Sequence, residues 1–289
     1  MSRRRLVENG WSQSRLTAAV AGGALRPVLP ATYLPDHVVT DPLVLLATAR
    51  EHLGDEVVAV LGTAARLHRL SEPWPPDGRV HVRLPPGREQ VQRASFRFHT
   101  WKLDQCETTV VDGHRTTTLE RTLVDLMCLT DRLSAVAALD AALHRGEIDL
   151  DDADRLRRTT TRRRGAARSR GWWTEGDARA ESPLETRVRL RASDGGHRPH
   201  ELQRTFVADG RTFRTDFAWR QANGRWLVGE ADGHNVHDVP EALLHDRGRS
   251  NLLVATGNVD IVRFTWADTT RPATVPRLLN RILGPPQPR

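Results

Sequence analysis

Apolar residues recur at helical spacing in some segments of this chain and alternate with polar residues in others. Helical spacing over 41–53, 57–70, 119–129 and 133–145 predicts four helices in the first half. Between 79 and 118 the pattern changes to short alternating runs, broken by Pro-Pro-Gly and Asp-Gly, which is typical of a small antiparallel sheet. The first half is therefore predicted to combine helices with a sheet.

Near the start of the chain, a short helix precedes two brief extended runs. Ser12 is a natural cap for this helix, and the extended runs at 25–29 and 31–34 flank Pro30. A helix followed by a hairpin is the pattern of a small winged helix. The segment before Ser12 is too short for a complete three-helix unit, so the sequence predicts a partial winged helix.

The second half has the same mixed pattern. The Ser-Pro pair at 182–183 is typical of a helix start. Strands are predicted over 201–207 and 260–265, and helices over 240–253 and 274–283. Together with the first half, these elements indicate an α/β or α+β fold.

Acidic residues interrupt two apolar, strand-like runs of the second half. Asp216 lies in the run 211–219, and Glu230 and Asp232 lie in the run 225–233, with a turn between the runs. Residues two apart on a strand point to the same face, so Glu230 and Asp232 are expected side by side, and hairpin pairing can bring Asp216 alongside. Three clustered carboxylates repel one another unless a cation lies between them, and such oxygen ligands suit Mg²⁺ or Mn²⁺. The alternative is that these acids only flank a hairpin and are solvated.

The surroundings of these acids favour the metal site. The apolar run 226–228 is typical of a buried strand, yet it leads directly into Glu230 and Asp232. Burying unpaired carboxylates is costly, so a charge cluster at the end of a core strand usually has a function.

Arginine dominates the positive charge of the chain. Lys+Arg total 43 against 36 for Asp+Glu, which gives a net charge of +7, and Lys102 is the only lysine. The tract between 151 and 180 is dense in arginine and contains Arg155, Arg157, Arg158, Arg162, Arg163, Arg164, Arg168 and Arg170. This tract is predicted to connect two domains. Its guanidinium groups could contact nucleic-acid phosphates, or the tract could be a solvated linker helix.

The remaining composition bears on the compartment. No stretch approaches the roughly 20 apolar residues needed to cross a bilayer, and the first residues lack the apolar core of a secretion signal. A cytoplasmic protein without a membrane partner is expected. Cys106 and Cys128 are isolated thiols without metal-ligand spacing.

Several separated motifs of the second half carry a family resemblance. They are Glu181-Ser-Pro-Leu-Glu185, Gln203, Asp216, Glu230-Ala-Asp-Gly-His234, Asp246-Arg247 with Arg249, and Val262-Arg-Phe-Thr265. In this order, over about Ala180 to Leu283, they resemble the DUF559 domain of actinobacterial proteins. That domain is similar to the very-short-patch-repair endonucleases of the PD-(D/E)XK nuclease superfamily. The resemblance implies a nuclease-like domain over 181–289 with a restriction-endonuclease-like α/β/α fold.

The first half resembles an AbiEi-type antitoxin region, which often precedes such domains. The resemblance rests on the winged-helix segment, on Gly62-Thr-Ala-Ala65 with Leu67-His-Arg-Leu70, and on Thr118-Leu-Glu-Arg-Thr-Leu-Val-Asp125. It implies an antitoxin-like α+β region over 1–150, which would precede the arginine-rich connector predicted above over 151–180, and a toxin or defence-system protein as a partner beside DNA.

The nuclease resemblance also implies roles for individual residues. Glu185, Asp216 and Glu230 would bind Mg²⁺ or Mn²⁺, and Asp232 occupies a third acidic position. The usual motif has a lysine where this chain has Asp232, so the group expected to position the water is absent.

Histidine and arginine side chains are the expected partners of these acids. In the repair-endonuclease relatives a histidine takes part in the chemistry, and His234 or His237 could do so here, although a lone histidine is often an ordinary surface or core residue. Arg247 and Arg249 would offset charge on the phosphate. Together with Arg162, Arg163 and Arg164, they form the expected nucleic-acid contacts.

Two classes of function follow from these expectations. The first is metal-dependent phosphodiester hydrolysis of DNA, with Asp216, Glu230, Asp232, His234 and His237 as the catalytic residues. The second is a non-catalytic, antitoxin-like DNA-binding regulator with a degenerate nuclease fold.

Overall fold

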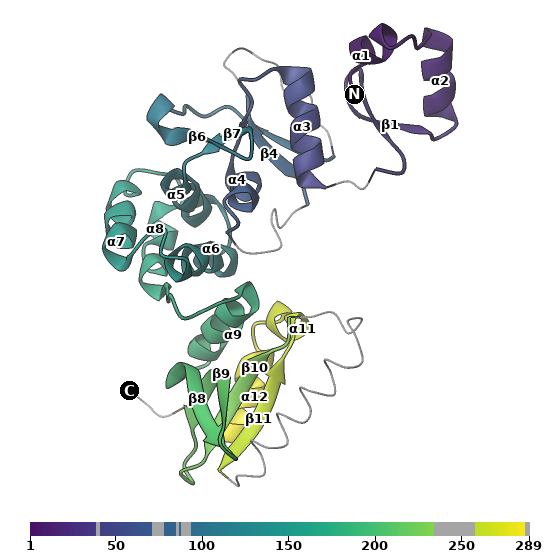
Figure 1. Cartoon of the computed structure of the whole chain (residues 1–289). Coiled ribbons are helices and arrows are strands. Elements are labelled where there is room, and N and C mark those ends of the chain that lie inside the picture. Colours follow the sequence, from purple (N-terminus) through teal and green to yellow (C-terminus); the bar gives the residue numbers. More distant parts are fainter. Residues whose placement is uncertain (39–40, 71–77, 85–86, 88–93, 234–257, 287–289) are drawn as a thin grey trace. The chain divides into compact units, whose positions relative to one another are not determined.

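The chain folds into two compact units that exchange segments along the sequence. The computed structural model describes residues 1–38, 41–70, 78–84, 87, 94–233 and 258–286 (Figure 1). The first unit comprises Met1–Thr130 and Leu156–Arg170, and the second comprises Asp131–Arg155 and Gly171–Arg289. Each unit contains helices and at least one sheet, which confirms the predicted α+β class. These units differ from the expected division at 150 and 180. Residues 131–155 belong to the second unit, and residues 156–170 belong to the first.

The first unit begins with two helices and a hairpin. Their bounds are α1 Arg3–Glu8, α2 Gln13–Ala21, β1 Leu25–Leu29 and β2 Thr32–Pro35. The two strands are antiparallel, and Ser2 forms an isolated bridge with Thr32. Leu6, Leu16 and Leu25 form a small core beneath them. Helix α1 has no counterpart in the pattern of the sequence, because its single buried residue, Leu6, gives no periodicity.

A five-stranded sheet and three helices follow. The strands are β3 Val58–Ala59, β4 Val80–Arg83, β5 Phe96–His99, β6 Thr108–Val111 and β7 His114–Thr117, in the order β5-β4-β3-β7-β6. The helices are α3 Pro42–Leu53, α4 Leu61–Leu67 and α5 Leu119–Leu129, and a 3₁₀ turn covers Gln105–Glu107. The sheet is mixed, because β4 pairs with β5 and β3 pairs with β7 in parallel.

One expected helix of this region begins later than the sequence predicts. The segment 57–70 starts with β3 and becomes helical only at Leu61. Four consecutive apolar residues, 57–60, are all buried. A short continuous apolar run fits a strand that is covered on both faces as well as it fits a helix, so periodicity alone did not separate the two.

The arginine-rich segment is folded and contributes to both units. It contains α7 Leu150–Thr159, α8 Ala166–Ser169 and a 3₁₀ turn over Trp172–Glu175. Gly165 approaches the end of α5 so closely that a Cβ there would lie 1.9 Å from the backbone oxygen of Cys128, and its φ is +90°. Only glycine adopts both features without strain. The turn before α8 is therefore fixed against α5.

The second unit contains a four-stranded sheet. The strands are β8 Glu201–Ala208, β9 Arg211–Arg220, β10 Trp226–Ala231 and β11 Val259–Phe264, in the order β11-β10-β9-β8. Pairing is antiparallel from β8 to β10, and β11 runs parallel to β10. The helices are α6 Arg132–His144, α9 Pro183–Asp194, α11 Trp266–Thr270 and α12 Thr274–Leu283. The strands expected in this half and its last helix are present, and the helix expected over 240–253 lies outside the described residues.

Helices α9 and α12 pack on one face of this sheet. Leu184, Val188 and Leu279 of the helices meet Phe217 and Trp219 of β9 in one buried cluster. None of the helices that the structure describes is long and apolar enough to cross a membrane.

A buried ionic contact joins α6 to α9. Asp140 is 1% exposed and accepts hydrogen bonds from Arg189 Nη2 at 2.6 Å, from Thr186 Oγ1 at 2.6 Å and from the backbone N–H of Asp177 at 2.7 Å. Burial raises the pKa of the Asp140 carboxyl to about 6, although these donors act in the opposite direction. The contact fixes the helix that carries Glu185.

Candidate active site

Glu185 is held in the first turn of α9 by the capping residues of that helix. The Ser182 hydroxyl accepts a hydrogen bond from the Glu185 backbone N–H at 3.2 Å. The carboxylate of Glu185 accepts one from the backbone N–H of Glu181 at 3.0 Å and one from Gln203 Nε2 at 2.9 Å. With a relative exposure of 7%, the side chain is buried. The helix start therefore fixes both the backbone and the carboxylate of this residue.

Asp216 lies in β9, where regular pairing with β10 stops. The last residue pair between these strands is Phe217 with Gly229. Asp216 directly precedes Phe217 in β9, and its carboxylate accepts a hydrogen bond from the backbone N–H of Ala231 at 2.8 Å. The side chain thus occupies the place of a backbone acceptor and is only partly exposed.

Gln203 connects these two acids. In the pairing of β8 with β9, Leu202 lies opposite Phe217 and Arg204 lies opposite Thr215, which leaves Gln203 and Asp216 facing one another without regular pairing. Gln203 donates to Glu185 and also hydrogen-bonds the Asp216 side chain. Its φ is +55°, a left-handed conformation that is uncommon for a non-glycine residue. Such strain is often found where a side chain is held for function.

One polar atom at this position has no partner in the described structure. Gln203 Oε1 is buried and accepts no hydrogen bond from the residues that the structure describes. A buried acceptor without a donor is costly, so this oxygen is a natural ligand for a cation or a water molecule.

Both carboxyl groups bind protons more tightly than usual. Burial raises the pKa of Glu185, and the nearby charge of Asp216 raises it further. Burial also raises the pKa of Asp216, against the hydrogen bonds from Ala231 and Gln203. Neither carboxylate forms an ion pair within the described ranges. A cation bound between them would relieve both the burial cost and the mutual repulsion.

The other two acids expected here are arranged differently. Glu230 lies in β10 beside Arg263 of β11. Asp232 lies beyond the end of β10, and its carboxylate accepts a hydrogen bond from Arg263 Nη1 at 3.1 Å. In the part of the chain that the structure describes, no three His, Cys, Asp or Glu side chains form a group that could hold a metal ion. Of the expected carboxylates, the structure thus brings Glu185 and Asp216 together.

Several expected site residues lie outside the described ranges. They are His234, His237, Arg247 and Arg249. Among the connector arginines, Arg162 and Arg164 are exposed. Arg163 is placed differently: its Nη1 donates to the buried carboxylate of Asp125 at 3.0 Å, and its Nη2 donates to Glu107 at 3.4 Å. These contacts give Arg163 a structural role in the first unit.

The contacts of Gln203 and of the Ala231 N–H with the two acids were not predicted from the sequence. Gln203 is part of the motif order, but its type and position do not indicate that it bonds two acids. The strand 201–207 also contains Glu201, Arg204 and Thr205, so a polar residue at position 203 gave no distinct signal.

Comparison with known proteins gives distant relatives. No protein-family model matches the chain. Two uncharacterized proteins of Mycobacterium tuberculosis, MT2308 of strain CDC 1551 / Oshkosh and Rv2248 of strain ATCC 25618 / H37Rv, are each 28% identical to it over 240 residues, covering 82% of this chain and 84% of the relative. The crystal structure of the RV2827C protein from M. tuberculosis aligns with a TM-score of 0.42 at 17% identity, covering 72% of this chain and 81% of that one.

Proposed function

We propose that the second unit is a divalent-metal-dependent endonuclease module that hydrolyses phosphodiester bonds of DNA. The observation that carries the proposal is the meeting of Glu185 and Asp216 through Gln203. The order of motifs that resembles the very-short-patch-repair endonucleases supports the same function. Mg²⁺ or Mn²⁺ would be the cofactor, and DNA would be the substrate.

The residues present fit such a cation. Mg²⁺ is usually bound by one or two carboxylates, together with waters and substrate phosphates. Glu185 and Asp216 would supply the two carboxylates, and the buried Gln203 Oε1 would supply a neutral oxygen. When bound, the ion would lower the pKa of a coordinated water and offset charge on the phosphate.

The chain itself would keep the ligands in position. The Glu181 N–H and Gln203 Nε2 hold one oxygen of Glu185, and the Ala231 N–H holds one oxygen of Asp216. Because these donors come from a helix start and from strands, the carboxylates lose little freedom when they bind an ion. Such support from a rigid surrounding usually determines how well a metal site works.

A plasmid cleavage assay tests this function. The full chain would be incubated with supercoiled DNA in Mg²⁺, in Mn²⁺ and in EDTA. We expect metal-dependent nicking, and we expect Glu185→Gln and Asp216→Asn each to reduce its rate. Loss of a group that only supports a metal ligand typically costs roughly 10–100-fold in activity, and loss of a ligand itself should cost more. These substitutions keep the shape of the side chains and remove the charge.

Asp209→Asn is the matched control. Asp209 is exposed in the turn between β8 and β9 and has a φ of +49°, which asparagine tolerates. This variant loses a carboxylate from the same hairpin and should cleave DNA at the rate of the unaltered chain. Equal rates in EDTA and Mg²⁺, or equal rates for all three variants, would refute the proposed site.

A second candidate is a DNA-binding regulator that does not cleave. The observation that favours it is Asp232, which stands where the nuclease motif has lysine and is bound to Arg263. This candidate predicts salt-sensitive DNA binding that is the same in EDTA and in Mg²⁺, without nicking.

A further inference from the structure

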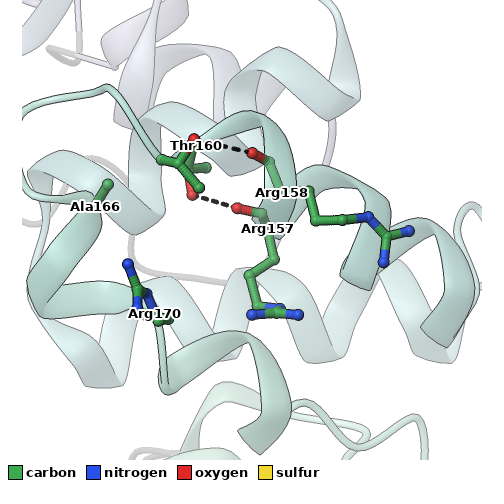
Figure 2. A pocket seen from close by; sticks show the side chains of 6 residues that line it. Arg157, Arg158, Thr160, Ala166 and Arg170 are labelled. Atoms are coloured by element: carbon green, nitrogen blue, oxygen red, sulfur yellow. Dashed lines mark hydrogen bonds between the residues drawn. The ribbon is translucent and has the colours of Figure 1, made fainter.

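The arginine-rich segment encloses a pocket in the first unit. The pocket lies where α7 ends and α8 begins, and its volume is about 290 Å³ (Figure 2). Its lining residues are Arg157, Arg158, Thr160, Thr161, Ala166 and Arg170. Ligand pockets for whole small molecules usually begin at about 300 Å³. This pocket is therefore at the lower end of that range and has room for a phosphate group with several waters.

The lining is strongly biased toward positive charge. Three of its residues are arginines, and no aspartate or glutamate is among the described residues that line it. Figure 2 shows the side chains of Arg157 and Arg170 extending on the same side of Thr160, whereas the side chain of Arg158 extends away from them. Guanidinium groups present several N–H donors in a plane, which matches the oxygens of a phosphate.

The two threonines of the lining turn their hydroxyl protons toward the backbone. Thr160 Oγ1 donates to the oxygen of Arg157 at 2.7 Å, and Thr161 Oγ1 donates to the oxygen of Arg158 at 3.3 Å. These bonds hold the end of α7 in shape. The charged donors of the lining are therefore those of its arginine side chains.

The backbone around the pocket is held by contacts with α5 and the residue that follows it. Gly165 packs against the Cys128 oxygen, and Arg168 Nη2 donates to the oxygens of Cys128 and Thr130 at 3.2 and 2.8 Å. Arg163 is bonded to Asp125 and Glu107. Thus two arginines of the segment fix the loop, and the arginines of the lining surround the cavity. A fixed backbone reduces the entropy lost on binding.

We infer that this pocket binds a phosphate group of a nucleic-acid backbone. The inference shares with the proposed function only the premise that the chain binds DNA, and it does not depend on cleavage. Arg157 and Arg170 would contact the phosphate oxygens, and Arg158 would add to the local positive potential. Such contacts carry no sequence information and would position the duplex on the first unit.

A DNA-binding titration in EDTA tests the inference without cleavage. Binding of a short fluorescent duplex by the full chain is followed by anisotropy at several salt concentrations. For the Arg157→Gln/Arg170→Gln variant we expect about tenfold weaker binding. The plot of log K against log salt concentration should become shallower by about 0.9, the slope of one phosphate contact. Arg97→Gln/Arg115→Gln, which removes two exposed arginines of the same unit, is the charge-matched control and should change both quantities less.

A second measurement uses inorganic phosphate as the probe. Broadening of its ³¹P resonance by the unaltered chain, reduced in Arg157→Gln/Arg170→Gln, would support an anion site at the pocket. Broadening without any change in DNA affinity would assign the pocket to a small phosphate compound and overturn the nucleic-acid part. Equal DNA affinity and slope for the pocket variant and its control would overturn the inference itself. Because the titration is run in EDTA, its result does not depend on cleavage and is separate from failure of the nuclease proposal.

Discussion

The Asp216 carboxylate accepts a hydrogen bond from the backbone N–H of Ala231 at 2.8 Å, beyond the last residue pair of β9 with β10. A side chain thereby replaces a backbone oxygen at the end of a sheet ladder. One carboxylate oxygen is fixed by the main chain. The acid is thus oriented by the fold before any ligand binds.

The first prediction concerns this bond. Asp216→Ala leaves the Ala231 N–H without its acceptor and should destabilise this end of β10 by about 1–3 kcal/mol. Asp216→Asn keeps an acceptor oxygen and should cost less. Hydrogen exchange of the peptide that covers β10, followed by mass spectrometry, measures the difference. Equal exchange in both variants would show that the bond does not protect the strand.

The second prediction concerns Gln203 as a positioning residue. Gln203→Ala removes its hydrogen bonds to Glu185 and Asp216. If these acids hold a metal, Mn²⁺ affinity measured by electron paramagnetic resonance should fall about 10–100-fold. Thr205→Ala, on the same strand, is the control. A loss of stability with unchanged Mn²⁺ affinity would leave Gln203 a purely structural residue.

The third prediction is a pH dependence at Asp140. Because the folded-state pKa of about 6 lies above the ordinary value of about 3.9, the folded state binds the proton more tightly. The stability that this group contributes is therefore full below pH 3.9 and is lost as the pH rises through 6. We compare the free energy of unfolding of the unaltered chain with that of Asp140→Asn. The difference, unaltered minus variant, should be about 2 kcal/mol larger at about pH 4.5 than at about pH 7.5. Urea unfolding at both pH values measures this, and a constant difference would contradict it.

The fourth prediction concerns the buried ion network of the first unit. Arg121 bonds Asp125 at 2.9 Å and Glu107 at 2.5 Å, and Arg163 bonds both acids. Asp125→Ala leaves a buried guanidinium group without its main partner, which typically costs about 3–5 kcal/mol. Glu120→Ala removes an exposed acid from the first turn of the same helix and should cost no more than about 1 kcal/mol. Similar unfolding midpoints for the two variants in urea would argue against a structural role for the network.

The fifth prediction tests the close approach of Gly165. Gly165→Ala places a Cβ 1.9 Å from the Cys128 oxygen, and its φ of +90° adds roughly 1–2 kcal/mol of backbone strain. The variant should be less stable and should bind DNA more weakly, because the arginine pocket is built on this turn. Gly171→Ala, with open space around its Cβ and a φ of −75°, is the control. If Gly165→Ala is destabilised but its DNA affinity is unchanged, DNA binding does not depend on the conformation of this turn.

Local patterns predicted most elements correctly where one face was buried. The helices starting at Pro42, Leu119 and Pro183 follow their capping residues, and the strands of the second unit lie where its strand-like runs predict them. The helix expected from Val57 begins only at Leu61 and is preceded by β3. The prediction was wrong there because a short apolar run does not distinguish a buried strand from a helix. Helix α1 was missed because burial of one leucine gives no period.

The candidate site was harder to predict than the fold. Asp216 and Glu185 were selected from motifs, and the structure joins them. Their connection depends on the left-handed conformation of Gln203 and on a break in strand pairing, which are set by tertiary contacts and leave no periodic signal. The same applies to Arg163, whose partners Asp125 and Glu107 are distant in the sequence.

The exchange of segments between the two units has a practical consequence for dissecting the molecule. A fragment ending at residue 150 would lack 156–170 of the first unit and would carry α6 without α9, its partner across Asp140. A fragment starting at 181 would lack α6, so Thr186 and Arg189 would face water. Cutting the gene at either position should give insoluble or partly folded products, and loss of activity in such pieces would not locate the function in the missing half.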